Sequence, residues 1–460
     1  MMRYIFAAVL AVVCSACDGS NARRPDVVLI VADTLRADRF SGQGGPGELT
    51  PYMDRIAAGG VRFVQARSHA PWTLPSTASL LTSLRPLEHG AGGRLPRFTR
   101  LSEDVTTLAK SFNDAGYQTH AVVNVLFLDP DTFGVTRDFD SVDNVSFESN
   151  VEVRTARATT EAALEWLDAR KDSDEPVFLL VHYFDPHCVY APPPAFRERW
   201  ADAGDKGGTW TFGTRAQMLA IRDGEYTPKA ATLARAESLY NGEVAYLDAE
   251  IGRLEVGLEE RGMTGEGSVF ALTSDHGEEF GEHSGFEHGH TLFDELLRVP
   301  LIVRAPGALD AGGVVDEPVR LIDVAPTLLE LCDLPLPPQY VGRSLVGLAR
   351  GEPDAPRSTM AHGNMWRTPG SAWISGGWKL IEEEGAEPRL FDLSSDPAEA
   401  RNLANDEPKK LAEMRAEVAA VQRGMRAQAH GKEADLDEQT FEILRELGYA
   451  PSVKPPEREE

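Results

Sequence analysis

The chain has 460 residues, enough to bury a large core, and its hydrophobic, glycine and proline contents are those of a globular protein. Its formal net charge of −26 argues against nucleic acid as a partner and disfavours anionic membrane surfaces. Any anionic ligand would therefore have to be held locally, by a metal ion and by helix ends.

The first seventeen residues, MMRYIFAAVLAVVCSAC, predict an export signal. One early arginine precedes an apolar run from Tyr4 to Val13, and small residues follow up to Cys17. The run is too short to span a membrane. The stretch CSAC resembles a bacterial lipobox, in which the last cysteine is lipidated. We therefore expect an exported protein of the periplasm or cell envelope, either secreted or anchored by a lipid at Cys17.

Strands and helices alternate through most of the remaining chain. Continuous apolar runs predict buried strands, and amphipathic runs predict helices. The predicted strands are 26–31, 118–124, 176–184 and 268–274, and the predicted helices are 104–115, 159–171 and 232–261. This alternation predicts an α/β fold with a doubly wound, mostly parallel sheet and helices on both faces.

Three of the predicted strands end in acidic or imidazole side chains. Asp33 follows the first strand, Asp185 and His187 follow the third, and Asp275 and His276 follow the fourth. Each is a common turn residue on its own. Because doubly wound sheets bind ligands beyond the carboxyl ends of their strands, together they predict one convergent site.

Residues 70–83, APWTLPSTASLLTS, predict a helix that starts at Pro75 with Thr73 at its entrance. Unpaired amides and the positive end of the helix dipole would hold a phosphate or sulfate beside the Thr73 hydroxyl. The alternative is that Thr73 is an ordinary N-cap.

Residues 273–300 carry four of the eleven histidines in a glycine-rich loop: His276, His283, His288 and His290. Aspartate oxygen and imidazole nitrogen together suit Ca²⁺, Mg²⁺, Mn²⁺ or Zn²⁺. The position of this loop, directly after a strand, favours a functional site over chance.

We expect two further histidines and two cysteines to have structural roles. His120 and His182 lie within predicted strands, so we expect them to be core residues. Cys188 and Cys332 are too few for a disulfide framework, and two separate buried thiols are expected.

The pattern changes after residue 332. A proline-rich stretch, DLPLPPQYVG, is followed by the stretches SAWISGGWKLIE and PRLFDL, which predict antiparallel strands, and by a predicted helix at 406–428. We therefore divide the chain into a catalytic domain at 25–345, a small α+β subdomain at 355–430, and an acidic tail at 431–460. The segment FEILRELGYA in the tail predicts a short helix that docks back.

The order and spacing of several motifs resemble the sulfatase family of the alkaline phosphatase superfamily. These motifs are VLIVADTLRADRF, LTPYMDRIAAGGVRF, APWTLPSTASLLTSLRPLEHG, VHYFDPH, TSDHGEEFGEH, LLRVPLIVRAPG, DVAPTLLEL and LFDLSSDPAEARNLA. They cover nearly the whole mature chain. The resemblance implies a sulfatase-like fold and metal-dependent ester hydrolysis.

The resemblance also implies roles for individual residues. Asp33, Asp275 and His276 would be ligands of one divalent metal ion, and Thr73 falls where the family keeps its nucleophile. His187 matches a histidine on the substrate side.

Further contacts to the substrate follow from the same resemblance. His290, and with it His288, occupies the region where another cationic group contacts the anion, and His187 or His290 would protonate the leaving group. Asn124 falls where many sulfatases have a substrate-binding lysine. Thr34 replaces the second residue of an Asp pair and would lie at the substrate.

Three departures from the family pattern change the expected chemistry. Thr73 and Thr77 stand in place of the Cys and Arg of a Cys-x-Pro-x-Arg motif, and Thr34 removes one acidic ligand. Sulfatases oxidise the motif cysteine to formylglycine, whose hydrated aldehyde attacks sulfur. Oxidised threonine would be a methyl ketone, which hydrates poorly, so this mechanism is implausible here.

An unmodified threonine nucleophile instead resembles superfamily relatives that act on phosphorus. A metal lowers the pKa of a bound oxygen strongly, for water from about 15.7 to about 7 on zinc. We therefore predict that Thr73 attacks a phosphate ester, most simply a diester or a phosphonate, and forms a covalent phosphothreonine. The alternatives are a sulfate-ester hydrolase that works without formylglycine and a non-catalytic module that binds anionic glycans. The oligomeric state is left open.

Overall fold

The computed structural model describes residues 23–94, 97–144, 154–170, 173–200, 214–222, 224–425 and 431–446. The predicted export signal, with Cys17, lies outside the described residues. Among the helices that are described, none combines the length and the apolar character needed to cross a membrane.

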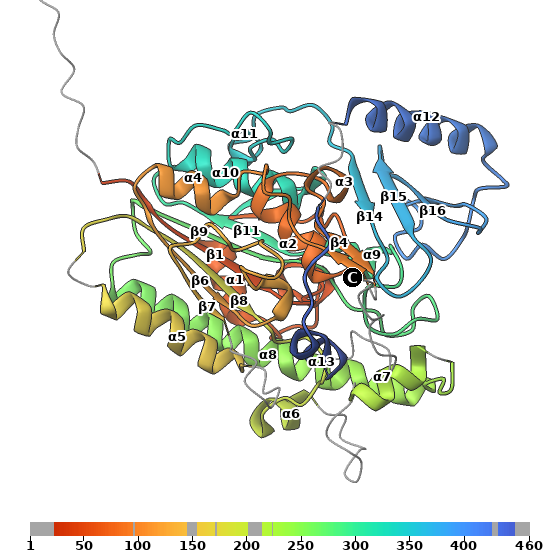
Figure 1. Cartoon of the computed structure of the whole chain (residues 1–460), viewed down its shortest axis with the longest axis horizontal. Helices are drawn as coiled ribbons and strands as arrows, with labels where there is room; N and C mark the ends of the chain where they lie inside the picture. Colours follow the sequence, from red (N-terminus) through yellow and green to blue (C-terminus); the bar gives the residue numbers. More distant parts are fainter. Residues whose placement is uncertain are drawn as a thin grey trace, which may run out of the picture.

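A mostly parallel sheet forms the centre of the molecule (Figure 1). Within the described residues it has eight strands in the order β12-β2-β11-β9-β1-β8-β6-β7, and β11 runs antiparallel to both of its neighbours. The strands are β1 Asp26–Ala32, β2 Val61–Phe63, β6 Gln118–Val123, β7 Ser141–Asn144, β8 Val177–Tyr183, β9 Ser268–Ser274, β11 Leu301–Arg304 and β12 Gly313–Val315. The α/β fold predicted from the sequence is confirmed.

Both faces of the sheet are buried, which explains the continuous apolar runs of its central strands. In β1, Val27, Leu29 and Val31 belong to one hydrophobic core, and Val28 and Ile30 belong to a second core on the opposite face. Side chains alternate between the two faces along a strand, so every position of a doubly covered strand must be apolar.

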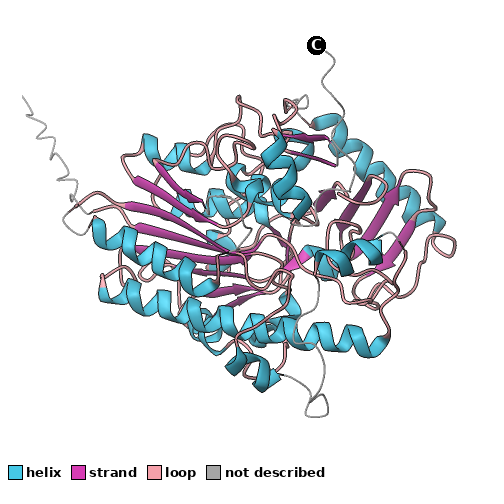
Figure 2. Cartoon of the chain, turned by 60° about the horizontal axis from the view of Figure 1, so that its bottom comes forward, coloured by secondary structure: helices cyan, strands magenta, loops and turns pink. Residues whose placement is uncertain are grey.

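Helices cover the sheet in two layers (Figure 2). One layer contains α1 Pro51–Ala58, α5 Ala156–Ala169, α6 Pro194–Trp200, α7 Arg215–Arg222 and α8 Ala230–Glu260. The other contains α2 Thr73–Thr82, α3 Pro86–His89, α4 Leu108–Asp114, α10 Val324–Leu331 and α11 Val346–Ala349. Each layer packs against one face of the sheet and buries one apolar core there. The two cores hold the sheet in a fixed position.

Some helices begin at different residues from those predicted, because capping decides where a helix starts. The helix predicted at 104–115 begins at Leu108, where the Thr107 hydroxyl accepts a hydrogen bond from Lys110 N at 3.1 Å. The helix predicted to start at Pro75 begins two residues earlier, at Thr73. Proline is tolerated there, since amides in the first turn have no intrahelical acceptor.

Smaller sheets connect the core to the C-terminal part of the chain. Among the described residues they comprise β3 Ala66–Arg67, β10 Arg298–Val299 and β13 Val319–Arg320, a hairpin of β4 Gly92–Arg94 and β5 Arg97–Thr99, and an antiparallel sheet of β14 Thr359–His362, β15 Gly370–Ser375, β16 Trp378–Glu383 and β17 Arg389–Asp392. The short helix α9 Asp294–Leu297 precedes β10, and α12 Pro408–Gly424 packs on the antiparallel sheet. The predicted stretch SAWISGGWKLIE therefore forms the two strands β15 and β16, PRLFDL forms β17, and all three are antiparallel to their neighbours.

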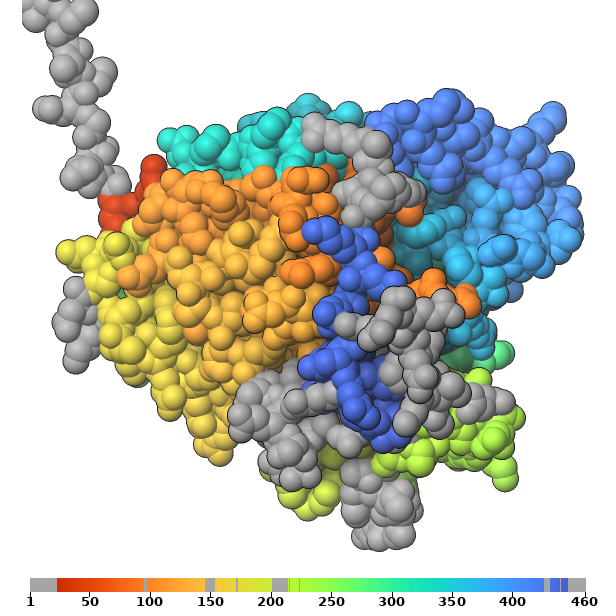
Figure 3. Space-filling model, in the orientation of Figure 1, coloured from red at the N-terminus to blue at the C-terminus, as the bar shows by residue number. Residues whose placement is uncertain are grey.

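The tail segment 431–446 lies back on the main body, in dark blue over the orange part of the chain in Figure 3. Ala434 N donates to Phe98 O at 2.8 Å, and α13 Glu438–Glu446 buries Phe441 and Leu444 in the core that contains Phe98. The segment 431–446 therefore forms part of the apolar core that contains Phe98.

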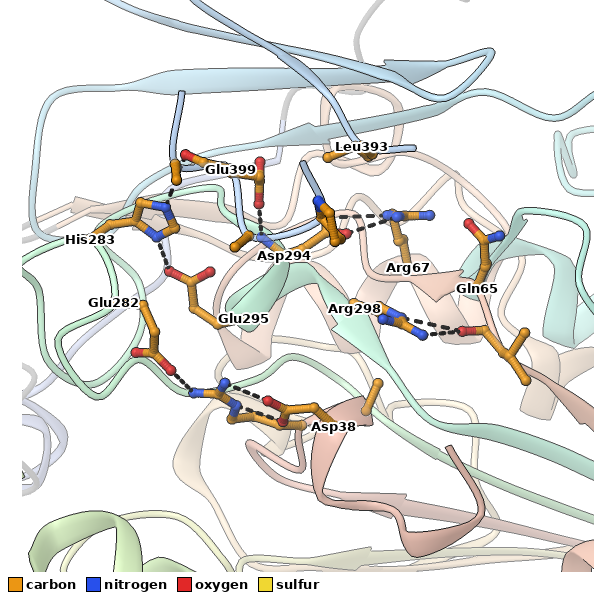
Figure 4. Close-up of a pocket in the computed structure, with 16 residues that line it drawn as sticks. Asp38, Gln65, Arg67, Glu282, His283, Asp294, Glu295, Arg298, Leu393 and Glu399 are labelled. Atoms are coloured by element: carbon orange, nitrogen blue, oxygen red, sulfur yellow. Dashed lines mark hydrogen bonds and ion pairs between the residues drawn. The ribbon is translucent and has the colours of Figure 1, made fainter. Parts of the chain in front are cut away.

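A buried ionic network joins the antiparallel sheet to the main body. Lys379 on β16 is fully buried, and its Nζ lies 3.0 Å from Asp294 Oδ1 and 2.9 Å from Glu399 Oε1. Arg67 Nη2 lies 2.8 Å from Asp294 Oδ2. Figure 4 shows Asp294 bonded to both Arg67 and Glu399 at the wall of a cavity of about 920 Å³. Burial raises the pKa of Glu399 to about 7, although Lys379 opposes the rise.

The Lys379→Met variant tests this network. We expect a loss of about 3–5 kcal/mol in the free energy of unfolding, because Glu399 is left buried without its cation. A carboxyl group whose pKa is raised in the folded state contributes less stability as pH rises through that pKa. Removing Lys379 raises the pKa of Glu399 further. The loss in the free energy of unfolding should therefore be larger at pH 8 than at pH 6.

Denaturant unfolding at both pH values measures this effect. The Arg401→Ala variant, which breaks the exposed Arg401–Asp406 pair, is the control and should unfold like the parent. A Lys379→Met protein as stable as the parent at pH 8 would show that the network does not hold the two parts together.

Candidate functional site

The register of the three central strands brings two carboxylates together. Ala32 at the end of β1 lies opposite Tyr183 on β8 and Ser274 on β9, so the residues that follow emerge at the same edge of the sheet. Asp33 and Asp275 are the first residues beyond β1 and β9. This edge is the place where parallel sheets bind ligands.

Asp33, Asp275 and His276 form a buried group whose ligating atoms all lie within 4.8 Å of one another. His276 Nε2 lies 3.5 Å from Asp33 Oδ1 and 3.5 Å from Asp275 Oδ2. Both oxygens of Asp33 and Oδ2 of Asp275 are buried without a hydrogen-bond partner. Such orphaned acceptors are costly unless a cation satisfies them, so the group fits a divalent metal ion.

The pKa values in this group reflect the burial of two acids close to each other. Burial raises the pKa of Asp275 to about 6, and the nearby charge of Asp33 adds to the rise. Burial also opposes ionisation of Asp33, but the surrounding histidines hold its pKa well below the ordinary range. A divalent cation would relieve this repulsion directly.

Thr34 adopts an unusual backbone conformation beside the two acids. Its φ of 58° lies in the left-handed region, which β-branched residues rarely enter. Two contacts hold it there: Thr34 N donates to Asp275 Oδ1 at 3.3 Å, and Thr34 O accepts from Tyr240 Oη at 2.7 Å. The Thr34 hydroxyl is buried without a partner at this position. Strain of this kind is typical of functional sites.

Thr73 lies at the N-terminal end of α2, against the same group. Its Oγ1 is 3.4 Å from His276 Nε2, and the side chain is buried. The helix is fixed there because the Ser76 hydroxyl donates to Asp275 O. Trp72, not Thr73, is the N-cap residue, and no side chain caps the helix, so the N-cap alternative for Thr73 is wrong.

His288 packs between His276 and another predicted substrate-side histidine, His187. The ring of His288 lies 4.5 Å from that of His276 and 4.9 Å from that of His187. His288 Nδ1 is 2.9 Å from Glu278 Oε1, and burial lowers the pKa of His288, which keeps the ring neutral. His187 donates from Nδ1 to Cys188 O, so Nε2 is the nitrogen placed to exchange a proton.

His290 is held by a carboxylate. Its Nε2 lies 2.8 Å from Glu279 Oε2, and the two side chains are packed so closely against Gly285 that a Cβ there would lie 2.1 Å from His290 Nε2. Burial raises the pKa of Glu279, but the hydrogen bond and charge of His290 and the backbone hydrogen bonds from Gly285 and His283 together lower it below the ordinary value. The pair fixes the orientation of His290 through Glu279.

Asn124 does not offer a donor to the site. It is buried, and its Nδ2 donates to Thr159 Oγ1 at 2.9 Å and to His182 O. Only the carbonyl oxygen of the amide is left without a partner, and an oxygen acceptor repels an anion. This geometry argues against the predicted contact between Asn124 and an anionic substrate.

His182 is the residue that the sequence interpretation missed. It pairs with Val31 in the sheet and was expected to be a core residue, but its Nε2 lies 3.5 Å from Asp33 Oδ2. The side chain is fully buried, and neither ring nitrogen has a hydrogen-bond partner. We interpret His182 as a group that orients Asp33. Its only sequence signal is a histidine inside an otherwise apolar strand.

Glu279, His283 and Glu295 form a second group of possible ligands, and His283 and Glu295 line the cavity in Figure 4. Its atoms already bond to one another and to the backbone: His283 Nδ1 lies 2.6 Å from Glu295 Oε1, and Glu279 Oε1 accepts from His283 N at 2.9 Å. We therefore interpret this group as structural.

The cysteines agree in part with expectation. Cys188 and Cys332 are separate free thiols, and Cys332 is buried, but Cys188 is only partly buried.

Known proteins resemble this chain in sequence and in fold. Residues 25–334 match the family model described as "Sulfatase", and residues 281–426 match one described as "N-sulphoglucosamine sulphohydrolase, C-terminal". An arylsulfatase of Clostridium perfringens is 25% identical over 447 residues, which cover 84% of this chain and 92% of that protein.

Solved structures share the fold. The structure of BT4656 in complex with its substrate D-glucosamine-2-N,6-O-disulfate has a TM-score of 0.72 and 22% identity, and the match covers 87% of this chain and 98% of that chain. The phosphonate monoester hydrolase SpPMH from Silicibacter pomeroyi has a TM-score of 0.68 and 21% identity, with 89% and 96% covered.

Replacing His182 tests its role beside Asp33. We expect His182→Gln to weaken binding of the divalent metal about 10–100-fold, the usual cost of losing a group that orients a ligand. Competition with a fluorescent chelator measures the affinity, and elemental analysis gives the stoichiometry.

The matched control is His120→Gln on the adjacent strand β6. That ring stacks on Trp166, and its Nδ1 is 2.7 Å from Ser141 Oγ, away from the two acids. Its metal affinity should equal that of the parent. Equal affinities in both variants would make His182 a packing residue after all.

Proposed function

The chain belongs to the sulfatase family, whose members are hydrolases of the alkaline phosphatase superfamily, and on this basis we propose that Thr73 is its nucleophile and that phosphate or phosphonate esters are its substrates. The observation that carries this proposal is the position of Thr73 Oγ1, 3.4 Å from His276 Nε2 at the amino end of α2. A hydroxyl placed there faces both the acidic group and the amides of a helix terminus.

The choice of phosphorus over sulfur follows from the residue type. Thr73 stands where the family pattern has the cysteine or serine that becomes formylglycine, and a threonine cannot give an aldehyde. The unmodified hydroxyl must then attack directly, which suits phosphoryl and phosphonyl centres. Phosphonate monoester hydrolases from Silicibacter pomeroyi and Agrobacterium radiobacter are among the structures that share the fold.

Each residue has a defined part in the proposed reaction. Thr73 Oγ1 loses its proton to solvent and forms a bond to phosphorus while the bond from phosphorus to the leaving oxygen breaks. His187 or His290 gives a proton to that oxygen. Water then attacks the phosphothreonine, releases the acid product and restores the Thr73 hydroxyl. Amides at the start of α2 stabilise the charge on the transferring oxygens.

Asp33, Asp275 and His276 would hold one divalent cation, either Ca²⁺, Mg²⁺, Mn²⁺ or Zn²⁺, with His182 orienting Asp33. When bound, such an ion lowers the pKa of a nearby hydroxyl and neutralises charge on the transferring group. The donor set of two carboxylates and one imidazole suits each of these metals.

Sulfate-ester hydrolysis by the same threonine is the second candidate. It is favoured by the relatives themselves, which include an arylsulfatase and a protein solved with a disulfated glucosamine. For the cellular location, the export signal with Cys17 supports a periplasmic or envelope protein, secreted or lipid-anchored.

Mass spectrometry of the trapped protein separates the two candidates. A slowly hydrolysed phosphonate ester should leave a phosphonyl group on Thr73, and the corresponding sulfate ester should leave none. Site mapping by peptide fragmentation identifies the modified residue. A sulfated Thr73 with no phosphonyl adduct would reverse the assignment.

Two variants of α2 support the same test. Thr73→Ala should retain the metal and lose turnover by at least about three orders of magnitude, as for removal of other nucleophiles. Thr82→Ala changes a hydroxyl at the far end of the same helix, where it donates to Ala78 O, and should retain turnover and the adduct. Retained activity in Thr73→Ala would show that another group attacks.

A further inference from the structure

Three segments that are distant in sequence meet beside the candidate site. They are the end of α7 at Arg222, the loop 287–290, and the loop 363–366 that follows β14. Met365 N and Trp366 N donate to Gly289 O at 2.6 and 3.1 Å. The Arg222 guanidinium lies over the Trp366 ring, 3.7 Å from its centre, and Arg222 Nε donates to Glu287 Oε1 at 2.7 Å.

This meeting point is directly connected to the reacting groups. Gly289 lies between His288 and His290 in the chain, and its amide donates to Pro71 O at 2.9 Å, two residues before Thr73. The Trp72 indole donates to Gly363 O at 3.2 Å, so the loop 363–366 also contacts the start of α2. The loops 287–290 and 363–366 therefore both contact the segment of chain that leads into Thr73.

The packing around Gly289 shows that this arrangement is specific. Its φ of +76° favours glycine, and a Cβ there would lie 3.1 Å from Trp366 Nε1. The indole is thus seated against the backbone between the two histidines. Arg222 on its face is a rigid, preorganised cation, because stacking and the bond to Glu287 remove most of its rotamer freedom.

We propose that Trp366 and Arg222 form a leaving-group subsite that selects esters of a ring bearing an acidic substituent, such as a carboxyphenol or a sugar acid. The subsite rests on the proposed function, since it assumes ester cleavage at Thr73. A half-buried indole offers a flat apolar surface for a ring. The planar guanidinium matches the two oxygens of a carboxylate or of a second anionic ester group.

The charge balance supports an anionic substituent. Asn124 and Thr77 do not supply the cations of the family pattern, and Glu278, Glu279 and Glu287 surround the site. Arg222 adds positive charge at this edge, and its side chain is 17% exposed whereas that of Glu287 is 2% exposed. Burial raises the pKa of Glu287 to about 7, although Arg222 lowers it.

Paired substrates test the subsite. The 4-carboxyphenyl and 4-carbamoylphenyl esters of methylphosphonate have the same shape and differ in charge. The parent should prefer the carboxylate in kcat/KM by about tenfold, the size of one charge-assisted hydrogen bond. In Arg222→Gln that ratio should fall to about one. Glu287→Gln removes the competing acid and should raise the ratio above that of the parent.

Arg199→Gln is the matched control. Arg199 on α6 also has a glutamate partner, Glu48, and lies over a tryptophan ring, Trp200, but it is exposed. The ratio in this variant should equal that of the parent. Trp366→Leu should weaken both esters together without changing their ratio, because the indole contacts the ring and not the charge.

Binding to the inactive Thr73→Ala protein separates this proposal from the proposed function. Calorimetry should show tighter binding of the carboxyphenyl ester, and the preference should disappear in the Thr73→Ala, Arg222→Gln double variant. If the parent hydrolyses neither ester, the proposed function is wrong. The relative binding of the two esters to Thr73→Ala still tests whether the subsite exists. Equal binding of both esters by Thr73→Ala would overturn the subsite.

Discussion

The contact between Asp33 and Asp275 is the constraint on which the site depends. Two carboxylates with unsatisfied oxygens sit at the buried edge of a rigid sheet, where water cannot separate them. They are brought there by the register of β1 and β9, in which Ala32 lies opposite Ser274, and by the two apolar cores that hold both strands in the centre of the sheet. The sheet that stabilises the fold therefore also holds the two acids close together, and a bound cation would relieve their repulsion.

The loop between β9 and β10 serves both the site and the junction with the C-terminal sheet. His276 and His288 face the acids, whereas Asp294 at the other end of the loop joins Arg67 and Lys379. Glu279 links the two regions, since it accepts from His283 N and bonds to His290. The position of His290 thus depends on contacts that extend toward the C-terminal sheet.

The sequence predicted those features that local patterns encode. Continuous apolar runs gave the central strands, and strand-end position identified Asp33, Asp275 and His276. Features that depend on tertiary contacts were not predictable in this way. His182 looks like any residue of a buried strand until the register places it beside Asp33, and helix starts shift because a single hydroxyl, such as that of Thr107, caps the first turn. Arg222 and Trp366 are 144 positions apart and meet only in the folded chain.

The docked tail has a consequence for how the molecule is made. Phe441 and Leu444 complete the apolar core that contains Phe98, yet they are separated from it by more than three hundred residues. During synthesis they leave the ribosome long after Phe98. The surface beneath them stays open until they arrive, so the growing chain carries an uncovered apolar patch that only this later segment, or a chaperone, can shield.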